Sequence, residues 1–173
     1  LPKPLLTING DALIERSVNI LVDAGIKEVT VVVGYMRDKI QQHMGDHVHY
    51  VHNPFYPVTG NLASCWFGLS ALPREPLLYL HGDLVFSPVL IKRILSTKLE
   101  EEAVLLVDFD SIDEEAMKVR IEKHKFIESS KDIPLPEAAG EWTGIARFSA
   151  GAKDILCHTI DSLLAEGNFH AYD

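Results

Sequence analysis

The sequence has few cysteines, few basic residues and no long hydrophobic run. Its two cysteines, Cys65 and Cys157, show neither the spacing of a zinc site nor that of a disulfide framework, so we expect reduced thiols in a cytoplasmic protein. Only 16 Lys and Arg stand against 25 Asp and Glu, which excludes the basic surface of a duplex nucleic-acid binder. The apolar run at 29–33 is far shorter than the ~20 residues that span a bilayer. We therefore expect neither a nucleic-acid nor a membrane partner.

The composition fits one compact domain over residues 1–173. The chain is 47% hydrophobic and 24% charged, which suffices for a buried core with a solvated surface. Its formal net charge of -9 means that an anionic substrate has to be met locally, by a few lysines or by a metal ion.

Hydrophobic periodicity predicts alternating helices and strands. A helix is expected over 11–24, capped by Asn9 or Asp11, and the β-branched run at 29–35 suits a strand buried on both faces of a sheet. The same patterns predict further helices at 36–44, 61–72 (with Asn61 as N-cap), from Ser87-Pro88 onward and at 149–166, and strands at 47–52, 77–80, 103–107, 117–122 and 126–127. Since 117–127 has the pattern of a hairpin, a mixed sheet is expected.

Asp83 is the first candidate for chemistry. It follows the apolar run 77–80 and His81-Gly82, where the glycine removes side-chain bulk before the carboxylate. Ligands of strand-helix folds bind at the carboxyl ends of strands, and a carboxylate there can hold Mg²⁺ against phosphate oxygens. The alternative is a turn aspartate that caps backbone amides.

Two lysines are candidates for phosphate contacts. Lys3 lies between Pro2 and Pro4, so we expect it on a stiff, extended backbone that points the ammonium in one direction. Lys131 lies in a polar loop and could be a second phosphate clamp. For both residues the alternative is an ordinary solvated side chain.

Two further groups could bind small molecules. Gly60 and Asn61 lie at a loop-to-helix junction, where the amide could contact a base edge or could merely cap the helix. Glu141 and Trp142 could hold a cationic amine by charge and cation–π attraction, although a tryptophan in such apolar surroundings is more often part of the core.

The order of several short motifs resembles the sugar-phosphate nucleotidyltransferase superfamily. These motifs are Pro2-Lys3-Pro4-Leu5-Leu6, Val33-Gly34-Tyr35, Asn53-Pro54, Gly60-Asn61-Leu62-Ala63-Ser64 and Gly82-Asp83. Within the superfamily, the segments 61–66, 108–110, 131–132 and 142–145 are most similar to the branch of phosphocholine and aminoethylphosphonate cytidylyltransferases. The resemblance covers nearly the whole chain.

The resemblance implies a fold, a reaction and roles for particular residues. The fold would be a Rossmann-like three-layer α/β fold with a mixed, mostly parallel central sheet. The reaction would join an NMP, from CTP in this branch, to a small phospho- or phosphono-compound, with Mg²⁺ and release of pyrophosphate. The implied roles are phosphate contact for Lys3, metal ligand for Asp83, nucleotide binding for Gly60, Asn61 and Ser64, and acceptor binding for Lys131 and Gly144. The acidic and aromatic residues Asp108, Asp110, Glu141 and Trp142 favour an acceptor that carries an amine.

Two alternatives remain open at this point. One is a sugar-1-phosphate nucleotidyltransferase that uses UTP or dTTP, and the other is a non-catalytic, nucleotide-binding regulatory domain on the same fold. The resemblance also implies a glycine-rich phosphate loop before Leu1 and a second metal-binding aspartate after Asp173, so we expect a domain that is incomplete at both ends. Besides the NTP and the small acceptor, a second copy of the chain in a homo-oligomer is a further candidate partner.

Overall fold

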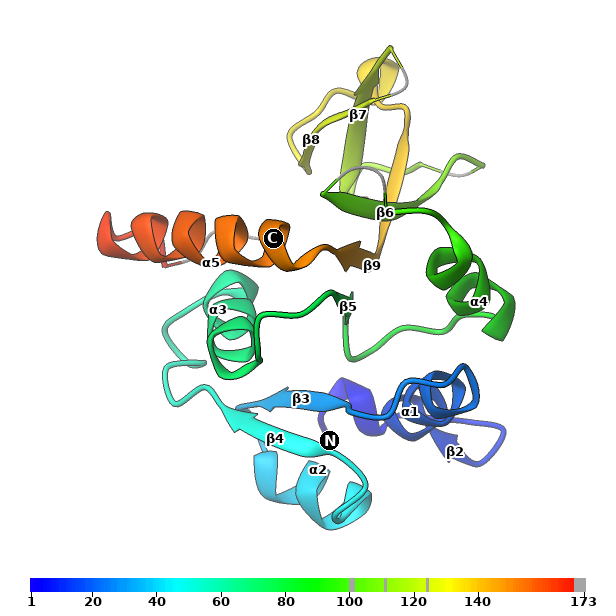
Figure 1. Ribbon diagram of the computed structural model, residues 1–173, viewed down its shortest axis with the longest axis vertical. Coiled ribbons are helices and arrows are strands. Elements are labelled where there is room, and N and C mark those ends of the chain that lie inside the picture. Colours follow the sequence, from blue (N-terminus) through cyan, green and yellow to red (C-terminus); the bar gives the residue numbers. More distant parts are fainter. Residues whose placement is uncertain (100–101, 111, 124, 170–173) are drawn as a thin grey trace.

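The computed structural model describes residues 1–99, 102–110, 112–123 and 125–169 (Figure 1). The helices are α1 (Leu13–Asp23), α2 (Arg37–Met44), α3 (Asn61–Ala71), α4 (Pro88–Ser96) and α5 (Ala150–Ala165), with short 3-10 helices at Lys3–Leu5 and Leu135–Glu137. The strands are β1 (Thr7–Ile8), β2 (Asp11–Ala12), β3 (Thr30–Val33), β4 (His49–His52), β5 (Leu77–Leu80), β6 (Ala103–Asp108), β7 (Lys118–Glu122), β8 (Lys125–Ser130) and β9 (Gly140–Phe148).

Helices cover both faces of the strands, as expected from the sequence. Strand β5 shows this because its successive side chains point to opposite faces. Leu78 and Leu80 pack in the cluster that contains Ile91 and Ile94 of α4 together with residues of α1. Leu77 and Tyr79 pack instead with residues of α3 and α5. Figure 1 shows α1 and α4 on one side of β5 and α3 and α5 on the other. The three-layer arrangement is confirmed.

Strand β9 connects the central sheet. It pairs antiparallel with β5 through residues 145–148, with β6 through residues at both of its ends, and with β7 through residues 140–141. Strands β5 and β6 therefore run in the same direction on two sides of β9. Strands β3 and β4 form a parallel pair, and β7 and β8 form the expected hairpin. Among the described residues, every pairing within the five-stranded sheet is antiparallel, and the parallel pair of β3 and β4 forms a separate sheet. The expected mostly parallel central sheet is therefore wrong, because β9 runs antiparallel between β5 and β6 and separates these two like-directed strands. The layering remains that of a Rossmann-like α/β fold.

The beginning of the chain differs from the expectation. Asn9 and Gly10 both have positive φ, 55° and 99°, and form the turn of a small hairpin between β1 and β2. Asn-Gly is the dipeptide that such a turn favours, since both residues tolerate this conformation. Helix α1 begins two residues later than Asp11, with Ala12 at the N-cap and no side-chain cap. The predicted capping by Asn9 or Asp11 is therefore wrong.

The other end of the sequence contains a strand that the sequence pattern did not predict. Residues 140–148 form β9, although Gly140 and Gly144 weaken the strand signal in this segment. Gly140 is required by packing, because a Cβ atom there would lie 2.5 Å from the carbonyl oxygen of Asp108. The close approach of β6 to β9 thus explains a glycine that looked like part of a loop.

Helix length and cysteine pairing can both be compared with the expectations from the sequence. In the described part of the chain, no helix combines the length and apolar character needed to cross a bilayer. Neither Cys65 nor Cys157 forms a disulfide bond, and Cys65 packs in the core between α3 and α5.

Candidate functional site

Lys3 and Asp83 lie next to each other at the carboxyl end of β5. The chain leaves β5 at Leu80, and the ammonium of Lys3 lies 4.0 Å from the carboxylate of Asp83. The two side chains are 81% and 41% exposed, so both remain accessible to a ligand. A Cβ atom on Gly82 would lie 3.5 Å from Pro4, which shows that the lysine segment packs against the glycine before Asp83.

The backbone of Lys3 is not extended as predicted. Lys3 begins a 3-10 helix whose turns are closed by hydrogen bonds from Leu5 to Pro2 and from Leu6 to Lys3. A proline φ near −65° suits a 3-10 helix as well as an extended chain, and this explains the error. The direction of Lys3 is set by this turn.

Gly144 lies beside the same loop. The amide of His81 donates to the carbonyl of Gly144 at 3.0 Å, and Gly144 has a φ of 79°. A Cβ atom at this position would lie 2.7 Å from Nδ1 of His81. A glycine is therefore needed here on two grounds, conformation and space. The structure brings Gly144 within one hydrogen bond of the segment that carries Asp83.

The three residues assigned to nucleotide binding lie at the start of α3. Gly60 is the N-cap, no side chain caps this helix, and Asn61 is its exposed first residue. The alternative role of Asn61 as N-cap is therefore wrong, since the cap lies one residue earlier. Ser64 lies one turn into the helix, and its hydroxyl accepts a hydrogen bond from Asn53 at 3.0 Å. The uncapped amides and the amide of Asn61 remain available to a ligand.

Asn53 was quoted in the sequence motif without a role, and the structure supplies one. It is only 1% exposed and follows β4 directly. Its side chain donates to Ser64 and accepts from the amide of Phe55 at 2.9 Å, so it ties the loop after β4 to the start of α3. A polar residue before a proline at the end of a strand was the available signal.

The acidic residues assigned to the acceptor gather at one edge of the sheet. Asp108, at the end of β6, is the cross-strand partner of Glu141 in β9, so both side chains project from the same face. Asp110 follows, and its amide donates to the carboxylate of Asp108 at 2.9 Å. These carboxylates provide a locally negative surface.

Trp142 does not lie with these carboxylates but packs in the core. It is 8% exposed, its indole N–H donates to the carbonyl of Ile145 at 3.2 Å, and its ring stacks on Tyr79. Its packing partners include Val119 and Ala146. This burial favours the alternative interpretation, in which the ring belongs to the core.

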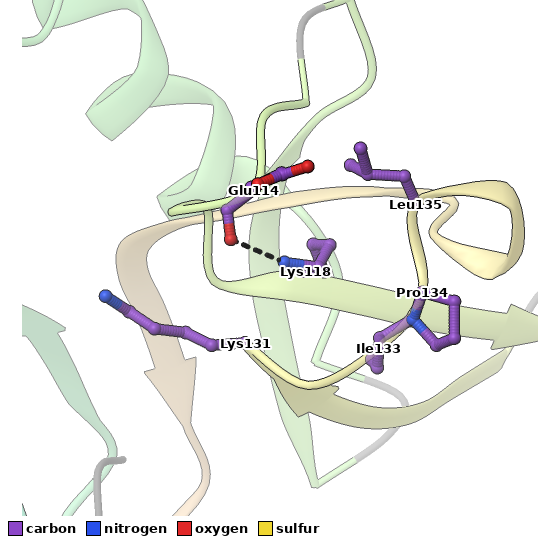
Figure 2. A pocket seen from close by; sticks show the side chains of 6 residues that line it. All are labelled: Glu114, Lys118, Lys131, Ile133, Pro134 and Leu135. Carbon is purple, nitrogen blue, oxygen red and sulfur yellow. Dashed lines mark hydrogen bonds between the residues drawn. The ribbon is translucent and has the colours of Figure 1, made fainter.

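Lys131 lies in the unit formed by β7 and β8. It follows the last residue of β8, and its ammonium lies 3.7 Å from the carboxylate of Glu115. Figure 2 shows it beside a cavity of about 280 Å³. The cavity is lined by Glu114, Lys118, Lys131, Ile133, Pro134 and Leu135.

A larger pocket of about 590 Å³ lies near the start of α3. Its lining is almost entirely apolar and contains no charged side chain, which is unsuited to phosphate binding. It is lined by Phe55, Val58, Thr59, Ala63, Trp66, Phe67, Leu164 and Phe169. We therefore do not count it as part of the candidate site.

The arrangement combines a carboxylate and a lysine at the end of one strand, a glycine that admits close approach, and an acidic edge nearby. Strand β5 leaves β9 opposite Ile145, and β7 joins β9 opposite Glu141. The segment with Asp83 therefore leaves the sheet in the short interval between these two pairings. Such a site can hold a metal-bound phosphate chain next to a cationic group.

Curated relatives and solved structures are similar to this chain. The CMP-5'-(3-aminopropyl)phosphonate synthase of Streptomyces rubellomurinus is 33% identical over 98 residues, which cover 54% of this chain and 15% of the relative. The 2-aminoethylphosphonate cytidylyltransferase of Lancefieldella rimae is 33% identical over 88 residues, covering 50% of this chain and 36% of the relative. The chain thus spans well under half the length of these relatives.

The fold has a counterpart among solved structures. The inositol-1-phosphate CTP transferase from T. maritima superimposes with a TM-score of 0.74 at 20% identity, covering 96% of this chain and 74% of that one. The family model of the MobA-like NTP transferase domain matches residues 2–142. The chain therefore belongs to the family of MobA-like NTP transferase domains.

Proposed function

We propose that the chain is the nucleotidyltransferase domain of a cytidylyltransferase. It would transfer CMP from CTP to a small phospho- or phosphono-compound, such as phosphocholine or 2-aminoethylphosphonate, and release pyrophosphate. Family membership supports the reaction class, and two relatives named for aminoalkylphosphonates support the acceptor class. We expect the enzyme to act in the cytoplasm, in keeping with two cysteines that show no disulfide spacing.

The observation that carries the proposal is the proximity of Lys3 to Asp83. Residues at opposite ends of a long stretch of sequence meet at 4.0 Å, at the end of a strand where α/β folds bind their ligands. In the proposed complex the Lys3 ammonium contacts a phosphate oxygen of the nucleotide. An accessible lysine beside a glycine-bearing loop suits this contact.

The donor set of the site fits magnesium. Mg²⁺ prefers oxygen ligands and is usually held by one or two carboxylates together with substrate phosphates and water. Asp83 offers one accessible carboxylate, and in the described residues no group of three or more His, Cys, Asp or Glu side chains could form a closed protein cage. Asp83 would therefore hold the ion jointly with the nucleotide, and the ion would offset the negative charge on the phosphates.

The start of α3 would receive the nucleoside. Gly60 carries no side chain that would hinder a ligand, Asn61 presents both donors and an acceptor, and Ser64 accepts a hydrogen bond from the buried Asn53. The acceptor would lie toward Asp108 and Glu141, whose carboxylates would attract its amine, while Lys131 would contact its oxyanion.

The acceptor needs little chemical activation. The oxygen of a phosphate or phosphonate is already an anion, so the residues of this chain have to align it with the α-phosphate and neutralise charge. Neither a general base nor a covalent intermediate is required. The chain's contribution is orientation, by Lys131 at one end of the acceptor and the carboxylates at the other.

A pyrophosphate-release assay on the intact protein tests the proposal. The four common NTPs would be combined with phosphocholine, 2-aminoethylphosphonate, inositol 1-phosphate and glucose 1-phosphate in the presence of Mg²⁺. We expect turnover with CTP and an amine-bearing acceptor. If CTP supports no turnover in any combination, the proposal is wrong, and preference for UTP or dTTP with the sugar phosphate would identify the alternative enzyme.

A further inference from the structure

Lys118 is a buried cation that the proposed function does not use. It is the first residue of β7, and its side chain points to the face of the strand opposite to that of the core residue Val119. It is nevertheless only 3% exposed. It lines the cavity described above together with Lys131 (Figure 2). A lysine is costly to bury, so its contacts indicate what its ammonium does.

The ammonium of Lys118 holds the backbone on both sides of one residue. It donates to the carbonyl of Glu114 at 2.9 Å and to the carbonyl of Ala116 at 3.5 Å. The residue between them is Glu115, whose own amide donates to the carboxylate of Asp113 at 2.8 Å. The backbone of Glu115 is thus fixed from three directions by polar groups.

Glu115 in turn contacts the lysine that we assign to the acceptor. Its carboxylate lies 3.7 Å from the Lys131 ammonium. Lys118 is the cross-strand partner of Ser130, the residue just before Lys131, so the two lysines start side by side. Figure 2 shows the Lys131 side chain extending away from the Lys118 ammonium. These contacts thus connect Lys118 to Lys131 through the turn that carries Glu115.

This unit lies close to the segment that carries Asp83. Lys118 is opposite Glu141 in β9, and His81 bonds to Gly144 in the same strand. Three residues of an extended strand separate Glu141 from Gly144, which corresponds to roughly 10 Å. Lys131 is thus connected, through β8 and β7, to the same strand β9 that contacts the segment before Asp83.

We propose that Lys118 is a positioning residue for the acceptor side of the site. By clamping the turn at 113–116 it fixes the backbone that carries Glu115, whose 91% exposed carboxylate is thereby kept beside Lys131 on the side of the site assigned to the acceptor's phosphate or phosphonate. The effect on acceptor binding rests on the proposed function, whereas the contacts of Lys118 and Glu115 do not depend on it. A methionine is easier to bury and fills similar space, yet it cannot hold two carbonyl groups.

The first measurement tests the geometry without any substrate. The variants are Lys118→Met, Asp113→Ala and Glu115→Gln, with Lys92→Met on the exposed surface of α4 as the control. Each protein is treated with an N-hydroxysuccinimide acetate, and the rate of Lys131 acetylation is followed by peptide mass spectrometry. We expect the three variants to change this rate at least about twofold, because an ion pair held in place alters both charge and access of the amine, and the control to leave it unchanged.

The second measurement tests the consequence for the acceptor. With CTP and 2-aminoethylphosphonate, Lys118→Met should raise the acceptor KM about fivefold and change the CTP KM less than about twofold. Lys131→Met should raise the acceptor KM further, and adding Lys118→Met to it should have no additional effect. Such non-additivity is expected only if the two lysines act through one contact.

The outcomes are distinguishable. An unchanged acetylation rate of Lys131 in Lys118→Met overturns the inference. Fully additive effects of Lys118→Met and Lys131→Met on the acceptor KM overturn it as well. An equal rise in the KM values for CTP and for the acceptor would indicate a general structural role of Lys118 and would also overturn it. If Lys118→Met does not fold, Asp113→Ala, which loosens the same turn from an exposed position, decides the question by the same criteria. If the acetylation rate changes but no acceptor supports turnover, the clamp is real and the proposed function is wrong.

Discussion

The ammonium of Lys3 lies 4.0 Å from the carboxylate of Asp83, across the gap between the first turn of the chain and the end of β5. Both side chains are exposed enough that the pair adds little to stability, since exposed ion pairs contribute about 0–1 kcal/mol. Its importance is therefore local: it places one positive and one negative group where a phosphate and a metal ion could each be held.

Replacing Asp83 by asparagine should separate chemistry from stability. We expect turnover to fall by roughly 10²-fold or more, because a charge-stabilising group is lost, while the free energy of unfolding changes by less than about 0.5 kcal/mol. Steady-state rates and urea unfolding check the two parts. Asp161→Asn on the exposed side of α5 is the control and should change neither. Normal turnover in Asp83→Asn would contradict the metal assignment.

Gly144→Ala should destabilise the fold more than a glycine replacement with conformational strain alone. At Gly25, where φ is 92° and nothing lies within 4 Å of the added Cβ, alanine should cost about 1 kcal/mol. At Gly144 the added methyl group also overlaps His81, which should cost about 1–3 kcal/mol more. Urea unfolding of both variants measures the difference. Equal losses would show that His81 moves aside freely.

Trp142→Phe tests whether the indole is part of the core or of the acceptor site. The variant loses the hydrogen bond to Ile145 and part of a buried ring, so we expect a loss of about 1–3 kcal/mol in unfolding free energy. The acceptor KM should change less than about twofold. Trp66→Phe, in a half-buried ring without that hydrogen bond, should cost less. A large rise in acceptor KM at full stability would restore the sequence-based assignment.

The ion pair of Arg74 with Asp154 should make the free energy of unfolding fall at acidic pH. The hydrogen bond from Arg74 is the main cause that lowers the pKa of Asp154 below its ordinary value of 3.8. A lowered pKa stabilises the folded state above the ordinary value, and this contribution is lost as the pH falls through the folded-state pKa. The stability difference between the wild type and Asp154→Asn should therefore be constant near neutral pH and shrink in acid. An NMR titration of the carboxyl group that gives an ordinary pKa would contradict this.

Local sequence signals predicted most helices and several strands. Ser87-Pro88 begins α4 as predicted, with the serine hydroxyl accepting from the amide of Val89, and Ser149 caps α5 in the same way. These signals succeed because the cap and the helix it serves are adjacent in sequence. Strand β5 was equally clear from its continuous apolar run.

Features decided by distant contacts were not predictable. Strand β9 contains glycines that only the approach of β6 and of His81 explains. Lys118 alternates with apolar residues in the way a solvated side chain does, yet it is buried and lines a cavity together with Ile133. For the glycines of β9 the deciding neighbours lie far along the chain, where local periodicity carries no information. For Lys118 the deciding groups are the nearby carbonyls of Glu114 and Ala116, which side-chain periodicity does not reveal.

In the candidate site, too, local sequence signals identified some residues correctly and distant contacts decided others. Asp83 and Lys3 were found from strand-end position and proline context, and the structure brings them together. Trp142 was assigned by its chemical neighbours in sequence, whereas its surroundings in space are the core. The roles of these residues in catalysis stay predictions until the variants above are measured.

The late position of β9 has a consequence for biosynthesis. In the described structure β5 and β6 both take β9 as their hydrogen-bonding partner, and the residues that join them end at Phe148. On the ribosome these two apolar strands lack this partner until the forty residues from 109 to 148 have emerged behind β6, which takes about 2–8 s at ordinary translation rates. Over that interval the nascent chain exposes unpaired strand edges, which favour aggregation until β9 pairs with them.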